Sequence, residues 1–163
     1  MIQKIAVSLR LKIGIGEKIM ANNEFRKLPV GIQSFNVIRE EGYLYVDKTD
    51  MVWKLANQGL KYNYLSRPRR FGKSVLVDTL QAYFEGRKEL FEGLKIMDLE
   101  KDWKQYPVIR LDMSRGGANA GTLRSYLNQR FKEYEEMYAI VTDPTAKLAD
   151  RFDAIITKAY KQT

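Results

Sequence analysis

Short apolar runs and longer stretches with apolar residues at helical spacing follow one another along the chain. The short runs are strand candidates, and they occupy residues 42–46, 60–65 and 106–113. The longer stretches repeat apolar residues every three or four positions, which predicts helices over residues 49–58, 73–86, 123–138 and 143–160. Shorter helical turns are predicted at residues 34–39 and 90–94, and a glycine-containing loop at residues 114–121.

Strands that alternate with helices favour one fold class. The pattern predicts an α/β protein, a three-layer α/β/α arrangement with a mainly parallel sheet. Local signals place the helix starts. Asp47 is expected to cap the helix that follows it, and Asp143 to cap the last helix with Pro144 at its first position.

The first 27 residues differ from the rest and are expected to form an N-terminal extension, with one domain over residues 28–163. Residues 7–15 alternate apolar and polar positions, as in a strand. Arg10 and Lys12 interrupt the run, so it is a poor signal-peptide core and too short to span a membrane. Because neither a signal peptide nor a membrane span is predicted here, we expect a cytoplasmic location. The alternative is that Met20 is the natural start and the preceding residues are upstream sequence.

Composition narrows the chemistry. The 163 residues contain no cysteine and no histidine, which excludes disulfides, thiolate or imidazole metal sites, and histidine-based catalysis. Lys and Arg total 28 against 20 Asp and Glu, a net charge of +8. This balance favours an anionic partner, such as a nucleotide, a nucleic acid or a membrane surface, and does not choose among them.

The stretch with the clearest chemistry is residues 67–74, Arg-Pro-Arg-Arg-Phe-Gly-Lys-Ser, between a predicted strand and a predicted helix. This is the order of a phosphate-binding loop, although Arg67 stands where the full pattern has glycine and Pro68 lacks an N–H. Gly72 permits close backbone approach, Lys73 suits β/γ-phosphates, and Ser74 suits Mg²⁺. Four cations within seven residues, beside a helix N-terminus, repel one another unless an anion is bound.

Several motifs together resemble a known family. They are Tyr-Val-Asp-Lys-Thr at 45–49, Leu-Ser-Arg-Pro-Arg-Arg-Phe-Gly-Lys-Ser at 65–74, Tyr-Phe-Glu-Gly at 83–86 and Leu-Phe-Glu-Gly-Leu at 90–94. In order and spacing they resemble the bacterial AAA-ATPase-like family, whose longer members often carry a C-terminal PD-(D/E)xK nuclease-like domain. The resemblance covers about residues 28–163, and the arginine-rich loop is the family's own variant of the Walker A sequence.

The resemblance implies a P-loop NTPase fold that binds ATP with Mg²⁺. The nucleotide-binding residues it implies are Arg67, Arg69, Arg70, Phe71, Gly72, Lys73, Ser74 and Val75. Ser74 is the implied Mg²⁺ ligand, reached through the nucleotide.

Hydrolysis in this fold also needs an acidic Walker B strand. The nearest candidate ends at Asp112, but Arg110 interrupts its apolar run, and a strand-end carboxylate is the simpler interpretation of Asp112. In the resembled family the acidic strand follows a helix like residues 143–160, so the chain is expected to be the N-terminal part of a longer protein. No catalytic residue is assigned, and the exposed sheet edge predicts marginal stability or self-association.

Two alternatives to ATP binding stay open. One is a non-enzymatic nucleic-acid or anion-binding module that uses the same arginines, and the other is a fragment without independent function.

Overall fold

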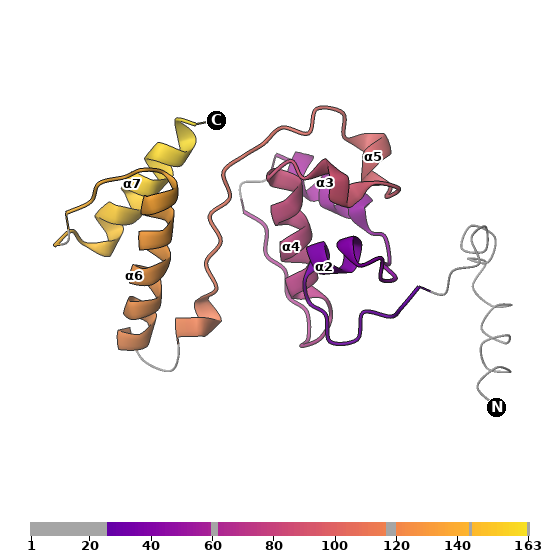
Figure 1. The fold of residues 1–163 in the computed structure, drawn as a ribbon, viewed down its shortest axis with the longest axis horizontal. Helices are drawn as coiled ribbons and strands as arrows, with labels where there is room; N and C mark the ends of the chain where they lie inside the picture. Colours follow the sequence, from indigo (N-terminus) through magenta and orange to yellow (C-terminus); the bar gives the residue numbers. More distant parts are fainter. Residues whose placement is uncertain (1–25, 60–61, 117–119, 144, 163) are drawn as a thin grey trace, which may run out of the picture.

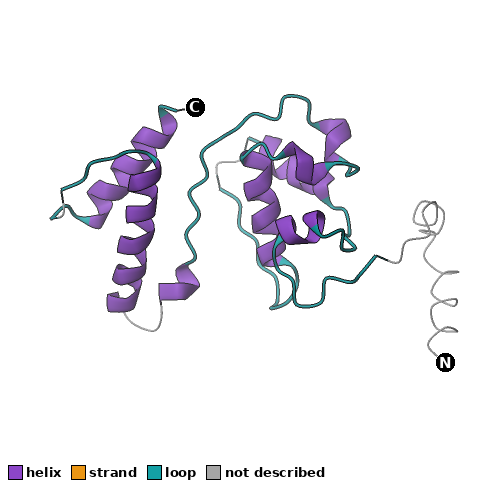
Figure 2. Cartoon of the chain, in the orientation of Figure 1, coloured by secondary structure: helices purple, strands orange, loops and turns teal. Residues whose placement is uncertain are grey.

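The computed structural model describes residues 26–59, 62–116, 120–143 and 145–162, and these form helices joined by loops (Figure 1). The elements are α2 (Phe35–Glu40), α3 (Thr49–Asn57), α4 (Lys73–Phe84), η1 (Lys88–Phe91), α5 (Ile96–Leu99), η2 (Met113–Gly116), α6 (Ala120–Met137) and α7 (Leu148–Tyr160). Within these ranges there is no strand (Figure 2). The predicted α/β fold with a parallel sheet, and the sheet edge that went with it, are therefore wrong.

Backbone hydrogen bonds explain why the strand-like segments form loops. The Leu44 N–H donates to the Lys27 carbonyl at 2.9 Å, and the Tyr106 N–H donates to the Phe84 carbonyl at 2.7 Å. Further along, Arg110 N–H donates to the Tyr134 hydroxyl at 2.8 Å. These N–H groups donate to a loop carbonyl, a helix-end carbonyl and a side chain, so they are not available to pair with a neighbouring strand.

The helical predictions fare better because they rest on local patterns. Helices α3, α4, α6 and α7 lie within or close to the stretches predicted for them. The start of α7 differs: it begins at Leu148, and Asp143 instead accepts hydrogen bonds from the Thr145 N–H and hydroxyl, both at 2.7 Å. A local turn thus takes the carboxylate that was expected to cap the helix.

Predictions for the first residues cannot be compared with the fold. The strand predicted at residues 7–15 and the alternative start at Met20 lie outside the described residues. Of the helices described, none combines the length and the apolar character needed to cross a membrane.

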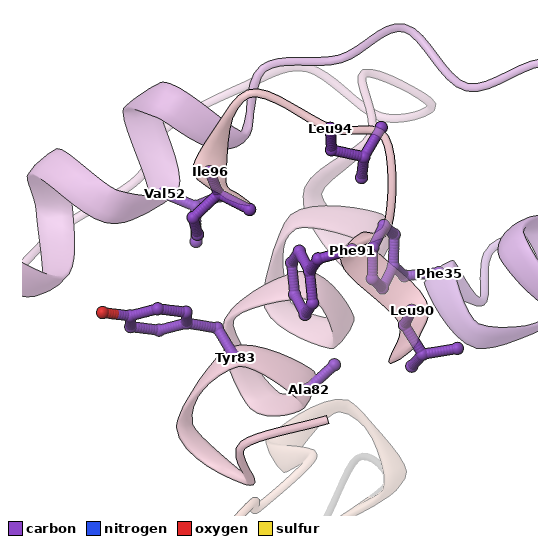
Figure 3. Close-up of a cluster of buried hydrophobic side chains, with 8 residues drawn as sticks. All are labelled: Phe35, Val52, Ala82, Tyr83, Leu90, Phe91, Leu94 and Ile96. Atoms are coloured by element: carbon purple, nitrogen blue, oxygen red, sulfur yellow. The ribbon is translucent and has the colours of Figure 1, made fainter. Parts of the chain in front are cut away.

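The N-terminal group of helices, α2 to α5 with η1, surrounds one apolar cluster (Figure 3). Phe35 of α2, Phe91 of η1 and Ile96 of α5 are completely buried in it. The Phe35 and Phe91 rings are 5.1 Å apart between centroids. Packing in this cluster joins the short helices α2, η1 and α5 to α3 and α4. Each of the three short helices has too few residues to be stable alone.

Helices α6 and α7 form a hairpin with a second apolar cluster. The Phe131 and Phe152 rings stack at 5.4 Å, and Ile155 is fully buried. Arg151 Nε and Nη2 donate to the two carboxylate oxygens of Glu135 at 2.7 and 2.8 Å. This two-pronged ion pair crosses from α7 to α6 with both side chains largely buried, so it fixes the register of the hairpin.

The loop at residues 101–112 runs from the first group of helices to the hairpin (Figure 1). Its anchor is Arg110, whose guanidinium forms an ion pair with Asp78 and donates to Gln81 Oε1 at 3.0 Å, both on α4. The Arg110 N–H donates to the Tyr134 hydroxyl of α6, and this hydroxyl donates to the Arg110 carbonyl oxygen at 3.2 Å. One residue therefore joins α4 to α6.

We predict that Arg110→Met lowers the free energy of unfolding by about 1–2 kcal/mol, because Asp78 is only 15% exposed and loses its charged partner. Asp78→Asn is expected to do the same, and the double variant to lose less than the sum of the two. Urea unfolding followed by circular dichroism measures this. Arg124→Met, an exposed arginine on α6, is the matched control, and equal losses in both arginine variants would contradict the assignment.

A second prediction concerns the Glu135–Arg151 pair. Hydrogen bonding from Arg151 holds the pKa of Glu135 below its ordinary 4.5, although burial opposes this. Glu135→Gln is expected to cost about 2–3 kcal/mol at neutral pH, because a buried guanidinium loses its partner. Because the pKa of Glu135 is lower in the folded state than its ordinary 4.5, its ionised form stabilises the folded protein. The wild type is therefore more stable than Glu135→Gln above pH 4.5. This difference disappears as the pH falls through the pKa of Glu135 in the folded state.

Unfolding curves at a series of pH values test this second prediction. The control is Glu133→Gln, which removes a more exposed glutamate of α6 that pairs with Arg130 along the same helix. Its cost should stay below about 1 kcal/mol. A cost for Glu135→Gln that did not depend on pH would refute the charged pair.

Candidate functional site

The basic loop, residues 67–74, leads directly into the first turn of α4. Gly72 is the N-cap residue and has a φ of 70°, in the left-handed region that glycine adopts readily. Arg70 also has a positive φ, 68°, which is unusual for a residue with a side chain. Two such residues close together turn the chain sharply just before the helix begins.

The start of α4 is electrically positive and has no carboxylate to offset it. No side chain caps the helix, and its first turn contains no acidic residue. Helix N–H groups without an intrahelical partner, together with the helix dipole, favour an anion at this position. The side chains of Arg67, Arg69 and Arg70 are exposed around it.

Lys73 folds back over the loop. Its Nζ donates to the carbonyl oxygen of Arg67 at 2.5 Å and reaches that of Pro68 at 3.5 Å. The ammonium group thus lies over the loop that precedes it, where it is still exposed to solvent. Because an ammonium has three donors, it can hold the loop closed and still meet an anion.

All eight residues implied as nucleotide-binding lie in one continuous turn, and their surroundings differ. Phe71 is 63% exposed, Ser74 is exposed on the first turn of α4, and Val75 is half-buried against the N-terminal apolar cluster. No cluster of three acidic residues suited to a metal occurs in the described ranges. Any metal at this site would therefore depend on oxygen atoms of a ligand in addition to the Ser74 hydroxyl.

An apolar groove of about 590 Å³ opens beside the basic loop. Residues between 28 and 32, the loop at 44–48, helix α3 and the first half of α4 line it. Arg67, Phe71 and Gly72 form its border with the basic loop, and Lys48 and Lys54 are its other cations. No carboxylate is among the lining residues, so the groove suits a flat apolar group attached to an anion.

A hydrogen-bond clamp holds one wall of the groove, and no local sequence pattern indicates its long-range half. Asp47 Oδ1 accepts from the Thr49 N–H at 2.9 Å, close to the capping role expected for it. Asp47 Oδ2 accepts from the Lys95 N–H at 2.8 Å, and buried Thr49 Oγ1 accepts from the Ile96 N–H at 3.1 Å. Partial burial works to raise the pKa of Asp47, but the hydrogen bonds that it accepts from Thr49 and Lys95 outweigh burial and lower the pKa. Together the three bonds fasten the start of α3 to the start of α5.

Asp112 belongs to a different part of the chain. Its Oδ1 accepts from the Ser114 hydroxyl at 2.5 Å and from the Ser114 N–H at 3.1 Å, at the start of η2. Its own N–H donates to the Tyr126 hydroxyl of α6 at 2.7 Å. These contacts give Asp112 a role in the structure of the turn beside α6.

An uncapped helix N-terminus, a cationic loop and an adjoining apolar groove thus occur together, and these are features that suit an anion. The chain belongs to the AAA-ATPase-like family: the family model described as "Predicted AAA-ATPase" matches residues 29–163. The resemblance drawn from the sequence motifs is thereby confirmed.

One curated relative is the "Uncharacterized protein in vnfD 5'region" of Azotobacter chroococcum mcd 1, which is 50% identical to this chain over 93 residues. The match covers 56% of the present chain and 18% of the relative, so the aligned segment is less than a fifth of that protein. No solved structure gives a significant match.

We predict that the backbone conformation of Gly72 contributes both to stability and to anion binding. A Cβ at this position meets no atom within 4 Å, so Gly72→Ala changes only the preference of the backbone. We expect it to cost about 1 kcal/mol of stability, and up to about fivefold in affinity for inorganic pyrophosphate, because relief of the strain shifts the turn away from the conformation that presents its N–H groups. Gly93→Ala is the matched control, because Gly93 has a φ of 73° and equally open surroundings outside the basic loop.

Thermal unfolding and calorimetric titration of both variants give the comparison. Both should lose stability, but only Gly72→Ala should lose pyrophosphate affinity. Equal affinity losses would show that the turn at Gly72 has no special part in holding an anion.

Proposed function

We propose that the chain binds a nucleoside triphosphate, ATP with Mg²⁺, with the phosphates held by the basic loop in the manner of a variant P-loop. The main support for the proposal is that three arginines and Lys73 lie directly at the uncapped N-terminus of α4. Cations held this close repel one another in the free protein. A polyphosphate relieves that repulsion and accepts hydrogen bonds from the guanidinium groups and the helix N–H groups.

The apolar groove supports a nucleotide over a simple anion. It begins at Phe71 and Gly72, so a ligand whose phosphates lie on the basic loop has an apolar surface within reach for its base. Half-buried Val75 and Leu76 and buried Val52 contribute to that surface. Stacking and burial of a flat base against such side chains adds affinity that pyrophosphate alone lacks.

Ser74 is the residue of this chain suited to Mg²⁺. Its exposed hydroxyl stands on the first turn of α4, one residue after Lys73. When bound with the nucleotide, Mg²⁺ would neutralise charge on the β- and γ-phosphates. The remaining ligands would come from phosphate oxygens and water.

The proposal concerns binding and assigns no residue to hydrolysis. Hydrolysis needs a carboxylate that holds Mg²⁺ or orients water. Two carboxylates of the elements around the site, Asp47 and Asp78, are already engaged: Asp47 in the clamp to Lys95, and Asp78 in the ion pair to Arg110.

A second candidate function is binding of single-stranded nucleic acid, and one observation favours it. Tyr62 and Tyr64 are 91% and 93% exposed just before the basic loop, and Phe71 is exposed within it. Exposed aromatic rings interleaved with arginines suit base stacking and phosphate contacts. The same loop would then serve a polymer instead of a mononucleotide.

Titration with a fluorescent ATP analogue, with and without Mg²⁺, tests the first proposal. Lys73→Ala is expected to weaken binding by about tenfold or more, the loss of one charge-assisted hydrogen bond. Ser74→Ala should reduce only the gain in affinity that Mg²⁺ brings. Lys132→Ala, an exposed lysine of α6, is the control and should bind as wild type does. Unchanged affinity in Lys73→Ala, or no binding by wild type, would refute the proposal.

Competition separates the two candidates. A single-stranded oligonucleotide that binds with a steep salt dependence, is not displaced by ATP, and is weakened by Tyr64→Ala would favour the nucleic-acid function. Displacement of the ATP analogue by unlabelled ATP, but not by the oligonucleotide, would favour the nucleotide-binding function.

A further inference from the structure

A second cavity, of about 200 Å³, lies at the other end of α4. Tyr83 and Phe84, from the last turn of α4, line it together with the end of α3 and the loop that follows α5. At 1.5 Å per residue, the last turn of α4 is roughly 16 Å along the helix from Gly72. The cavity is thus separate from the basic loop and the apolar groove.

Aromatic rings make up much of the cavity wall. Tyr83, Phe84, Trp103 and Tyr106 all line it. They meet edge to face, with centroid distances of 5.9 Å for Tyr83–Trp103 and 6.0 Å for Phe84–Tyr106. The hydroxyl of Tyr83 points away from Phe35 and Phe91 of the apolar cluster (Figure 3). The faces of such rings carry partial negative charge, which attracts cations.

Two carboxylates share this cavity. Glu100 accepts hydrogen bonds from the Tyr83 hydroxyl and, at 3.0 Å each, from the N–H groups of Lys101 and Asp102. Partial burial works against ionisation of Glu100, but these hydrogen bonds outweigh it and lower its pKa. Within the described part of the chain, Glu100 and Asp102 form no ion pair with a lysine or arginine. Lys104 is the lining's one cation, against two carboxylates, although the whole chain is basic.

The backbone around the cavity is tightly held. Trp103 has a φ of 45°, a left-handed conformation that costs energy for a residue with a large side chain. The loop passes so close to Gly86 that a Cβ there would lie 2.7 Å from Gln105 Cγ and 3.1 Å from the Trp103 carbonyl oxygen. The Tyr106 N–H donates to the Phe84 carbonyl at 2.7 Å. A strained tryptophan is therefore held at the wall of a preformed cavity.

We propose that this cavity binds an organic cation, the guanidinium or alkylammonium group of a ligand. The two carboxylates disfavour an anion, and a cation beside the aromatic rings would be attracted by both the ring faces and the negative charges of Glu100 and Asp102. A volume of 200 Å³ holds a cationic head group but is too small for a nucleotide. The group comes either from an arginine or lysine side chain of a polypeptide or from a free polyamine.

Calorimetric titration with three probes tests the proposal. Acetyl-arginine methylamide represents a side chain in a polypeptide, spermidine represents a free polyamine, and acetyl-citrulline methylamide has the shape of the arginine probe without its charge. We expect at least one cationic probe to bind and the citrulline probe to bind at least about tenfold more weakly. Preference for the arginine probe assigns the source to a polypeptide, and preference for spermidine assigns it to a polyamine.

Exposed positions provide variants that should still fold. Asp102→Asn removes one charge and Tyr106→Leu one ring, and each is expected to weaken the bound probe about three- to tenfold. Asp98→Asn, an exposed carboxylate of α5 outside the cavity, is the matched control and should have no effect. Equal binding of the arginine and citrulline probes, equal losses in Asp98→Asn and Asp102→Asn, or no binding of either cation below about 10 mM would overturn the proposal.

These experiments are independent of the proposed nucleotide site. Lys73→Ala should leave cation binding unchanged, so failure of one proposal says nothing against the other.

Discussion

The arrangement of this chain depends on the ion pair between Arg110 and Asp78. Asp78 lies in the middle of α4 and also accepts a hydrogen bond from the Phe35 N–H of α2 at 3.3 Å, so its carboxylate joins two helices of the first group. Arg110, which forms the ion pair with Asp78, also donates its backbone N–H to the Tyr134 hydroxyl of α6. Two apolar clusters that share no buried residue are thereby connected through polar groups, whose geometry is more directional than apolar contact.

Helix α4 consequently carries three roles along its length. Its N-terminus meets the basic loop, its middle holds the link to Arg110, and its last turn lines the aromatic cavity. A rigid helix keeps these places at fixed separations, because its hydrogen-bonded backbone does not compress. A ligand on the basic loop therefore acts on the same element that connects the two groups of helices.

The sequence predicted what local patterns determine. The helices at 49–57 and 73–84 follow from the spacing of apolar residues, which acts within a few residues of the chain. The sheet was predicted wrongly because a strand needs a partner far away in the chain, and the Leu44 and Tyr106 donors bond to a loop and a helix end. The clamp from Asp47 to Lys95 was missed for the same reason, since no local pattern reveals a contact across 48 residues.

The two proposed sites fit the electrostatics of the helix that they share. The aligned peptide groups of α4 place partial positive charge at Lys73 and partial negative charge near Phe84. The basic loop lies at the positive end, so it needs an anion to offset both the dipole and its own cations. Glu100 and Asp102 lie at the negative end, where a cation is favoured for the same reason. A chain with a net charge of +8 thus keeps one acidic cavity at the end of a helix where a cation is most stable.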